Sequence, residues 1–399
     1  MALKMATTLE CLACLVSFLA GYAHGDKVFD VTKYAASPDG SAEDNSKAFS
    51  NAWNAACQYN RSATLVIPKG TFLVGPIVFK GPCVSNPSPS VQIIGQLKAP
   101  SSLATFSGPS WIEFNDLHEL VLNGSGIVDG QGADAWNNKT CNKEKKCKNL
   151  PMSMRFINIV GGQITDLTLR DSKGFHVDFQ QSTSITVSHL NISAPGDSPN
   201  TDGIHISRTQ NINITNVFIS TGDDCISIGP GSINVTISDI TCGPGHGISV
   251  GSLGKYQNEK NVVGVKVKNC TVFDTTNGLR IKTWPGSPPS EASNITFEDI
   301  TMNNVSRPII IDQFYCPIHQ CTDQPSRVRI HDVVFRRVTG TTNTPVAVTL
   351  SCSSSMPCKN VQLQDIDLNF VSSNATKITS SCLNVEGEAS GTQNPNPCV

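Results

Sequence analysis

The sequence predicts an all-β protein, specifically a right-handed parallel β-helix with a short N-terminal capping helix. Three observations support this prediction. The 399 residues include 31 Gly and 23 Pro and are rich in Val, Ile, Thr, Asn and Ser, which suits short strands joined by turns. An internal repeat of alternating apolar and polar residues recurs along the chain. Each repeat holds two alternating segments with no helical segment between them, so only stacking of successive coils buries the apolar rows.

The repeat has the pattern apolar-x-apolar-x-Asp/Asn-apolar-x-apolar. An imperfect copy at 163–169 precedes clear copies, which start 23 to 33 residues apart at 185–192, 212–219, 235–242, 265–272, 295–302, 328–335 and 361–368. Alternation by two places the apolar side chains inward and the polar ones outward. A β-propeller is the alternative fold, but its repeats are longer, ~40 to 50 residues with four strands each, so the β-helix is favoured.

One segment near the N-terminus has helical periodicity instead. Residues 46–57 follow two possible caps, Asp44 and Asn45, and present an apolar stripe. The stripe consists of Ala48, Phe49, Ala52, Trp53 and Ala56. A solenoid needs its first coil covered, so we expect this helix to be the lid. Residues 79–154 should form early coils with long loops, and the tail after Leu383 should be irregular.

The first 25 residues have the order of a secretory signal peptide. Lys4, an apolar run at 11–20 and the small residues Ala23 and Gly25 correspond to its basic region, hydrophobic region and cleavage site. This run is far shorter than the ~20 apolar residues that span a bilayer. We therefore expect a secreted protein of the extracellular space or cell wall, with residues 26–399 forming a single β-helix domain. This domain should be a monomer without membrane association.

The fifteen cysteines fit an oxidising export route. Two lie in the signal peptide, and twelve of the other thirteen form six candidate pairs: Cys57 with Cys83, Cys141 with Cys147, Cys225 with Cys242, Cys316 with Cys321, Cys352 with Cys358, and Cys382 with Cys398. Cys270 remains, and its strand-like surroundings favour a small buried hydrophobe. Residues 26–399 contain no CxxC pair and no Cys/His zinc spacing, so we expect these cysteines to bind no metal.

Secretion also makes the Asn-x-Ser/Thr sequons meaningful, and we expect some of them to carry glycan. They stand at Asn60, Asn123, Asn138, Asn191, Asn213, Asn234, Asn269, Asn294, Asn304 and Asn374.

Charge is sparse, because only 16% of residues are charged and the formal net charge is −2. No global basic field exists to hold a nucleic acid, so we expect no nucleic-acid partner. Any anionic ligand must be held by a local cluster.

Such a cluster is predicted at the second alternating segment of four successive repeats. The residues immediately before this segment are Asp202, Asp224, His246 and Asn277, and Asp223 lies beside Asp224. Parallel strands lie ~4.8 Å apart, so equivalent positions in neighbouring coils are adjacent. Each motif alone is a good turn sequence and would be structural. Turn chemistry does not require all of them to fall in one column, and this coincidence favours a site.

The same alignment places cations on that face. At one outward position of the segment stand His205, Ser227, Ser249 and Arg280, and two residues further along Lys282 also points outward. Mutual repulsion among three carboxylates raises at least one pKa, which supplies a general acid, while the others can activate water. This is the chemistry of glycoside hydrolysis, and Arg280 with Lys282 would neutralise a carboxylated sugar.

Four motifs in this order resemble the signature of glycoside hydrolase family 28, the polygalacturonases. They are Asn200-Thr-Asp-Gly203, Gly222-Asp-Asp224, Gly243-Pro-Gly-His-Gly247 and Arg280-Ile-Lys282. The resemblance covers essentially the whole chain after the signal peptide. The segments 195–205 and 126–132 resemble plant members, above all the exopolygalacturonases of pollen. This sequence departs from many plant members at Asn137, after Trp136, where they have a second Trp.

The resemblance implies inverting hydrolysis of polygalacturonate, the backbone of pectin, without a metal or another cofactor. Asp223 would be the general acid, Asp202 and Asp224 would activate water, and His246 would assist. Asn200, His205, Arg280, Lys282 and Tyr315 would bind the substrate, Tyr315 as a substrate-lining tyrosine. Inverting enzymes keep their carboxylates ~6.5 to 9.5 Å apart, whereas adjacent coils predict less.

Three alternatives remain open at this point. Endo-acting hydrolysis differs from exo action only in loops that periodicity does not reveal. A pectate-lyase-like enzyme would use the Asp cluster for calcium and a basic residue to abstract a proton. A non-catalytic wall-binding protein would use the same face without turnover.

Overall fold

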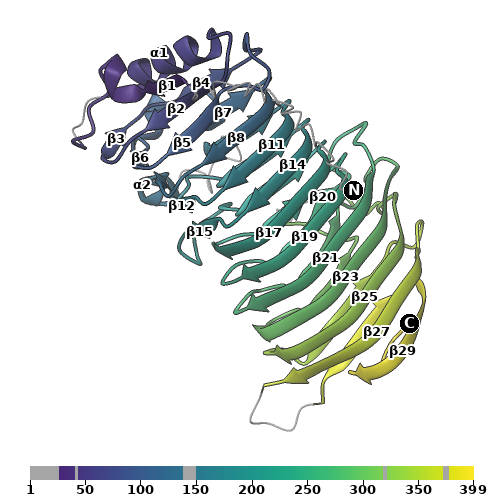
Figure 1. The fold of residues 1–399 in the computed structure, drawn as a ribbon. Helices are drawn as coiled ribbons and strands as arrows, with labels where there is room; N and C mark the ends of the chain where they lie inside the picture. Colours follow the sequence, from purple (N-terminus) through teal and green to yellow (C-terminus); the bar gives the residue numbers. More distant parts are fainter. Residues whose placement is uncertain (1–26, 41–43, 138–149, 318–320, 372–376) are drawn as a thin grey trace, which may run out of the picture.

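The structure is a computed structural model that describes residues 27–40, 44–137, 150–317, 321–371 and 377–399. The predicted signal peptide, the pair Cys141 with Cys147, and the sequons at Asn138 and Asn374 lie outside the described residues. Within them, two parallel sheets wind around one long axis, and the chain progresses steadily from the α1 end to the β29 end (Figure 1). The parallel β-helix is therefore confirmed, and the propeller is excluded.

The sheet that carries the predicted site has eleven strands, one per coil, and we call it the site sheet. Its strands are β4 (Ile77–Lys80), β7 (Ser110–Asn115), β10 (Met152–Ile157), β13 (Val177–Gln180), β16 (Ile204–Ser207), β18 (Ile226–Ile228), β20 (Ile248–Leu253), β22 (Leu279–Thr283), β24 (Ile309–Asp312), β26 (Val346–Ser351) and β28 (Thr379–Leu383).

The other sheet has eighteen strands, and we call it the broad sheet. It begins as two rows: β1 (Lys27–Asp30), β2 (Ala63–Ile67), β5 (Ser90–Ile93), β8 (His118–Asn123), β11 (Val160–Thr165) and β14 (Thr183–Ser188), beside β3 (Thr71–Leu73), β6 (Gln96–Lys98), β9 (Ile127–Asp129), β12 (Thr168–Arg170) and β15 (Asn191–Ser193). The rows merge where β14 and β15 both pair with β17 (Gln210–Ser220). The stack continues through β19 (Ile233–Cys242), β21 (Val262–Phe273), β23 (Ser290–Val305), β25 (Val328–Thr342), β27 (Cys358–Phe370) and β29 (Val385–Asn394).

The Asp/Asn position of the repeat is a bend in the broad sheet. Asn216, Asp239, Asn269 and Asp299 all have a φ between 51° and 58° there. Asn and Asp tolerate this left-handed conformation better than other side chains that carry a Cβ, which explains why the repeat selects them. The bend lets one strand run along two faces of the coil.

One copy of the repeat was misplaced by the sequence pattern. The register pairs Ile295 with Val333, so the copy at 328–335 is wrong, and the true copy begins at Val333. Its bend position is occupied by Arg337, which also has a positive φ of 49°. The pattern was misleading because Asp332 lies at another left-handed bend, with φ 55°, five residues earlier.

The expectation of an irregular tail after Leu383 is also wrong. Residues 385–394 form β29, which pairs in parallel with β27. The strand shows weak alternation because its side chains are mostly exposed or partly buried. Backbone hydrogen bonding to the preceding coil defines this last strand, and hydropathy patterns do not detect backbone pairing.

The predicted lid is confirmed as α1 (Ser46–Cys57), which covers the N-terminal end of the stack (Figure 1). All five residues of its predicted stripe are buried. Asn45 is the N-cap residue but makes no side-chain cap, whereas Asp44 Oδ1 accepts from the Ser46 N–H at 2.9 Å. Three short helical turns were not predicted: η1 (Val31–Tyr34), η2 (Leu103–Thr105) and α2 (Ala133–Trp136).

Core packing follows the coils. On the inner side of the site sheet, a column of aromatic rings begins at Trp53 of α1 and continues through the next four coils, with neighbouring ring centroids 4.9 to 5.1 Å apart. Its rings are those of Trp53, Phe79, Phe114, Phe156 and Phe179. In the next three coils Ile206, Ile228 and Val250 make the same inward position aliphatic. The inward rows of both sheets form one continuous apolar core.

The cysteine predictions hold wherever the structure describes them. Five disulfides join Cys57 to Cys83, Cys225 to Cys242, Cys316 to Cys321, Cys352 to Cys358 and Cys382 to Cys398. Cys270 is free and buried, and burial raises the pKa of its thiol to about 12, as expected for a packing residue. Across the described ranges, no helix is long and apolar enough to cross a membrane.

Candidate active site

Strand register brings the predicted column together. Ile204 pairs with Ile226, Ile226 with Ile248, and Ile248 with Leu279, so the residues two places before each are stacked neighbours. These residues are Asp202, Asp224, His246 and Asn277, as predicted. The outward column is also confirmed, because His205, Ser227, Ser249 and Arg280 are register partners.

Asp202 is held by a serine of the next coil. The Ser227 hydroxyl donates to Asp202 Oδ2 at 2.6 Å, and His205 Nδ1 lies 2.8 Å from Ser227 Oγ. When Asp202 is ionised, the single hydroxyl proton of Ser227 goes to Asp202, and His205 then donates to Ser227 from Nδ1. His205 is further packed against the ring of Phe175, at a centroid distance of 4.9 Å. His205 therefore contacts Ser227 and orients it toward Asp202.

Asp224 is held by two cations. Arg280 Nη2 lies 2.7 Å from its Oδ1, and Lys282 Nζ lies 2.7 Å from its Oδ2. The Ser249 hydroxyl also donates to Asp224 Oδ1 at 2.8 Å, and Arg280 Nε donates to Ser249 Oγ at 3.0 Å. All four side chains are nearly excluded from solvent. Arg280 and Lys282 thus reach back toward an acid that lies two coils earlier in the stack.

Asp202 and Asp224 are both buried, but their pKa values shift in opposite directions. Burial raises the pKa of Asp202 well above its ordinary value, and the nearby charges of Asp223 and Asp224 raise it further. Burial would also raise the pKa of Asp224, but the charges of Lys282 and Arg280 outweigh it and lower the pKa to about 2. The site therefore pairs an easily protonated carboxyl with a permanently ionised one.

Asp223 is the more accessible acid, with 19% of its side chain exposed. His246 Nδ1 lies 2.9 Å from Asp223 Oδ1, and Asn200 Nδ2 donates to Asp223 Oδ2 at 3.3 Å. His246 itself is 37% exposed. Neighbouring coils thus contribute one contact to each oxygen of the Asp223 carboxyl.

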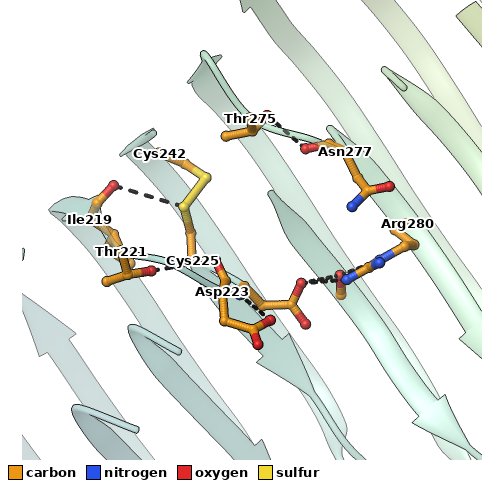
Figure 2. Close-up of a disulfide and its surroundings, with 10 residues drawn as sticks. Ile219, Thr221, Asp223, Cys225, Cys242, Thr275, Asn277 and Arg280 are labelled. Carbon is orange, nitrogen blue, oxygen red and sulfur yellow. Dashed lines mark hydrogen bonds and ion pairs between the residues drawn. A yellow bond between two sulfur atoms is a disulfide. The ribbon is translucent and has the colours of Figure 1, made fainter. Parts of the chain in front are cut away.

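A disulfide joins the two turns that carry these groups. Cys225 follows Asp224 directly, Cys242 ends the strand before the His246 turn, and the two sulfurs are bonded. Figure 2 shows this disulfide next to Asp223, with Arg280 reaching toward the carboxylates from a later strand. Gly247 is required after His246, since its φ is +80° and a Cβ would meet the Asn277 carbonyl oxygen at 2.2 Å.

Tyr315 closes the other side of the cation pair. Its ring centroid lies 5.2 Å from Lys282 Nζ and 5.9 Å from the Arg280 guanidinium carbon. The preceding Gln313 is fully buried and donates to the Val328 carbonyl at 2.8 Å, which anchors the segment. All nine predicted site residues therefore lie in one connected region.

The segment around Asp129 does not join this region. Asp129 is buried and its Oδ2 accepts from Arg170 Nη2 at 2.7 Å, while Trp136 Nε1 donates to the Lys173 carbonyl at 3.3 Å. These contacts tie β9 and α2 to the next coil. The motif at 126–132 is structural in this chain.

Sequence reasoning gave Ser227 and Ser249 no role, although each donates to a carboxylate. It also missed Asp178, the register partner of His205, which is fully buried and bonded through Oδ2 to Arg155 Nε at 3.0 Å. Burial raises the pKa of Asp178, and its Oδ1 has no hydrogen-bond partner among the described residues. The outward column that contains His205 continues back through Asp178 to Arg155, so aligning two earlier coils would have found both residues.

One oxygen or nitrogen of each of Asp223, Asp224 and His246 lies within 4.8 Å of the others, as in a cation site. However, both Asp224 oxygens already contact the cations Arg280 and Lys282, which would repel a divalent ion. The donor set is therefore a poor metal site. The arrangement of Asp223, Asp224 and His246 suits proton transfer to a ligand whose carboxylate is bound by Arg280 and Lys282.

Comparison with known proteins gives consistent results. The profile described as Glycosyl hydrolases family 28 matches residues 57–391. An exopolygalacturonase of Platanus acerifolia is 44% identical over 94% of this chain and 98% of its own. An exopolygalacturonase of Oenothera organensis is 47% identical over 89% of this chain and 98% of its own. The solved endo-xylogalacturonan hydrolase of Aspergillus tubingensis has a TM-score of 0.75 and 24% identity over 91% and 100% of the two chains, a likeness of fold.

Proposed function

The chain belongs to glycosyl hydrolases family 28, and from that premise we propose that it hydrolyses the α-1,4-galacturonosyl bonds of polygalacturonate. The observation that carries this proposal is the shared site of three carboxylates and two cations. Arg280 and Lys282 carry two positive charges against the one negative charge of Asp224, so these three side chains keep a positive charge that can face a uronate carboxylate. The acids lie beside it, as glycoside hydrolysis requires.

Asp223 is the proposed general acid, because it is the most accessible of the three and has a contact on each oxygen. Asp202 and Asp224 are the proposed pair that activates water, and His246 orients Asp223. Asp224 remains ionised at working pH, because its pKa is about 2. Asp202 must lose its proton to act as a base. Because its pKa is raised, it loses the proton only at a pH above that at which an ordinary aspartate ionises.

The raised pKa of Asp202 makes it the rival candidate for the acid, and an aryl galacturonide with a good leaving group separates the two assignments. Such a substrate needs little protonation of its leaving oxygen, so the variant that lacks the acid loses far less activity on it than on polygalacturonate. We expect this pattern for Asp223→Asn and not for Asp202→Asn. The reverse result would assign the acid to Asp202.

Inversion at the anomeric carbon is part of the proposal. An oxygen of Asp223 lies within 4.8 Å of an oxygen of Asp224, which is shorter than the ~6.5 to 9.5 Å expected between acid and base, so the stereochemistry needs a direct test. Proton NMR of the first product released should show the β-anomer. An initial α-anomer would establish retention and reject this mechanism.

Exo action is proposed because the Platanus and Oenothera relatives carry that name. Monogalacturonate should be released from polygalacturonate from the first time point. A ladder of oligomers would show endo action, and an unsaturated product or loss of activity with chelator would show a calcium-dependent lyase. Binding without any product would show a non-catalytic wall-binding protein.

We also propose that the protein is secreted to the cell wall as a monomeric glycoprotein with residues 26–399 as one domain. Sequons at Asn60, Asn191, Asn213, Asn234, Asn269, Asn294 and Asn304 are exposed, which supports glycosylation. Mass spectrometry of protein recovered from wall extracts, before and after deglycosylation, tests the mature N-terminus and the occupied sites. Light scattering tests the monomer.

A further inference from the structure

A row of aromatic rings continues from the cation pair onto neighbouring loops. Tyr315 packs against Lys282 and Arg280, and on its other side its ring lies 5.7 Å from Trp284 at an interplanar angle of 80°. Trp284 directly follows β22, the strand that carries both cations. The row therefore begins inside the candidate active site and leads out of it.

The row ends at an exposed cation, Lys255. Its Nζ lies 5.3 Å from the ring centroid of Trp284 and 5.3 Å from that of Tyr256. Tyr256 is 64% exposed. The loop is ordered by Glu259, whose carboxylate accepts from the Gly254 N–H at 2.6 Å and the Tyr256 N–H at 2.8 Å. A side chain held between two rings on such a loop is positioned in advance of any ligand.

Lys255 differs from the active-site cations in its charge balance. Arg280 and Lys282 share the charge of Asp224, whereas Lys255 forms no ion pair among the described residues. Glu259 of the same loop is engaged with backbone N–H groups. An unneutralised cation beside two aromatic faces matches the chemistry of a uronate, which combines a carboxylate with an apolar C–H face on its ring.

We propose that Lys255, Trp284 and Tyr256 form an additional subsite for a galacturonate unit, one sugar beyond the two that flank the cleaved bond. The ammonium of Lys255 binds the carboxylate of this unit, and the rings of Trp284 and Tyr256 pack on its sugar face. This subsite rests on the proposed function. It gives the site affinity for a chain of at least three uronates rather than for a dimer.

The experiment compares Lys255→Ala with the wild type on digalacturonate, trigalacturonate and pentagalacturonate. A dimer fills only the positions beside the cleaved bond, so its kcat/KM should change less than twofold. For the two longer substrates, KM should rise about fivefold with kcat nearly unchanged, the size expected for one exposed charge contact. Lys255→Arg should keep most of the affinity, and Lys260→Ala, which removes an exposed lysine from the same segment, is the matched control.

The aromatic part is tested by Tyr256→Ala against Tyr256→Phe, where only the first should raise KM for the longer substrates. The Lys255 effect should also shrink at about 1 M salt, because exposed charge contacts are screened. Equal losses on all three lengths, or no loss on any, would overturn the subsite. A wild type that hydrolyses none of them would overturn the proposed function instead, and calorimetric titration with trigalacturonate would still compare binding by Lys255→Ala and wild type.

Discussion

Two clusters of carboxylates and cations, one on each sheet, show how burial changes the meaning of the same pairing. On the broad sheet, Arg337 bonds Glu298 and Asp299 from the neighbouring coil, and its side chain is 44% exposed. On the site sheet, Asp224 bonds Arg280 and Lys282, and all three are nearly excluded from water. Both are cross-coil ion pairs, and the pattern of charges in the sequence does not distinguish them.

The two clusters differ in how strongly water screens their charges. Water screens the exposed cluster, so its ion pairs contribute little to stability and nothing prevents rearrangement. In the buried cluster the charges depend on each other, and removing one leaves the rest without compensation. A single substitution in the buried cluster is therefore expected to lower both stability and function.

The largest effect is expected for Asp224→Asn. Two buried cations would lose their counter-charge, which should cost about 3 kcal/mol or more in the free energy of unfolding, and hydrolysis should fall at least about a hundredfold. Urea unfolding at pH 7 and a reducing-end assay on polygalacturonate measure the two effects. Because the pKa of Asp224 is about 2, its contribution to stability is complete above the ordinary aspartate pKa and is lost as pH falls toward 2. Unchanged stability at pH 7 would contradict the buried ion pair.

Asp202→Asn should separate activity from stability. Activity should fall by about a hundredfold or more, because the carboxylate that we propose accepts a proton from water is gone. Stability should rise, because a carboxyl whose folded pKa is raised destabilises the fold above the unfolded pKa, and Asn removes that charge at neutral pH. Thermal and urea unfolding at pH 7 test this. A loss of stability equal to that of Asp224→Asn would show that the two acids have equivalent environments.

Ser227→Ala should give a smaller effect on the same acid. Its hydroxyl donates to Asp202 Oδ2 and stabilises the ionised form, so its loss should raise the pKa of Asp202 further. We expect kcat to fall about tenfold and the acid limb of the kcat/KM profile to move to higher pH. Ser238→Ala, which removes a buried hydroxyl bonded to Thr215 on the broad sheet, should leave the profile in place. An identical profile for both variants would remove Ser227 from the mechanism.

The smallest effect is expected for Arg337→Ala on the exposed cluster. The urea midpoint and the hydrolysis rate should both stay within experimental error, because water replaces the lost contacts to Glu298 and Asp299. A destabilisation comparable to that of Asp224→Asn would show that solvent exposure does not govern how much an ion pair contributes to the free energy of unfolding.

Much of this could be predicted from particular residues. The inward and outward alternation of Ile204-His-Ile-Ser207 and its equivalents predicted the coil register, and this register placed Asp202, Asp224 and His246 in one column. The copy at 328–335 failed because Asp332 and Arg337 occupy two different left-handed bends, and the consensus recognises only the Asp. The strand at 385–394 failed because its pairing is carried by the backbone rather than by side-chain pattern.

The sequence by itself therefore determined the solenoid and the residues that its register brings into one column, because these depend on periodicity and spacing along the chain. It offered the disulfide pairs as candidates, and the structure established the five that it describes. Only the tertiary structure decided how the acids differ. Arg280 and Lys282 reach the oxygens of Asp224, while Asp202 receives a serine hydroxyl. Electrostatic energies depend on distances and burial in three dimensions, so stacked aspartates with the same pattern acquire opposite pKa shifts.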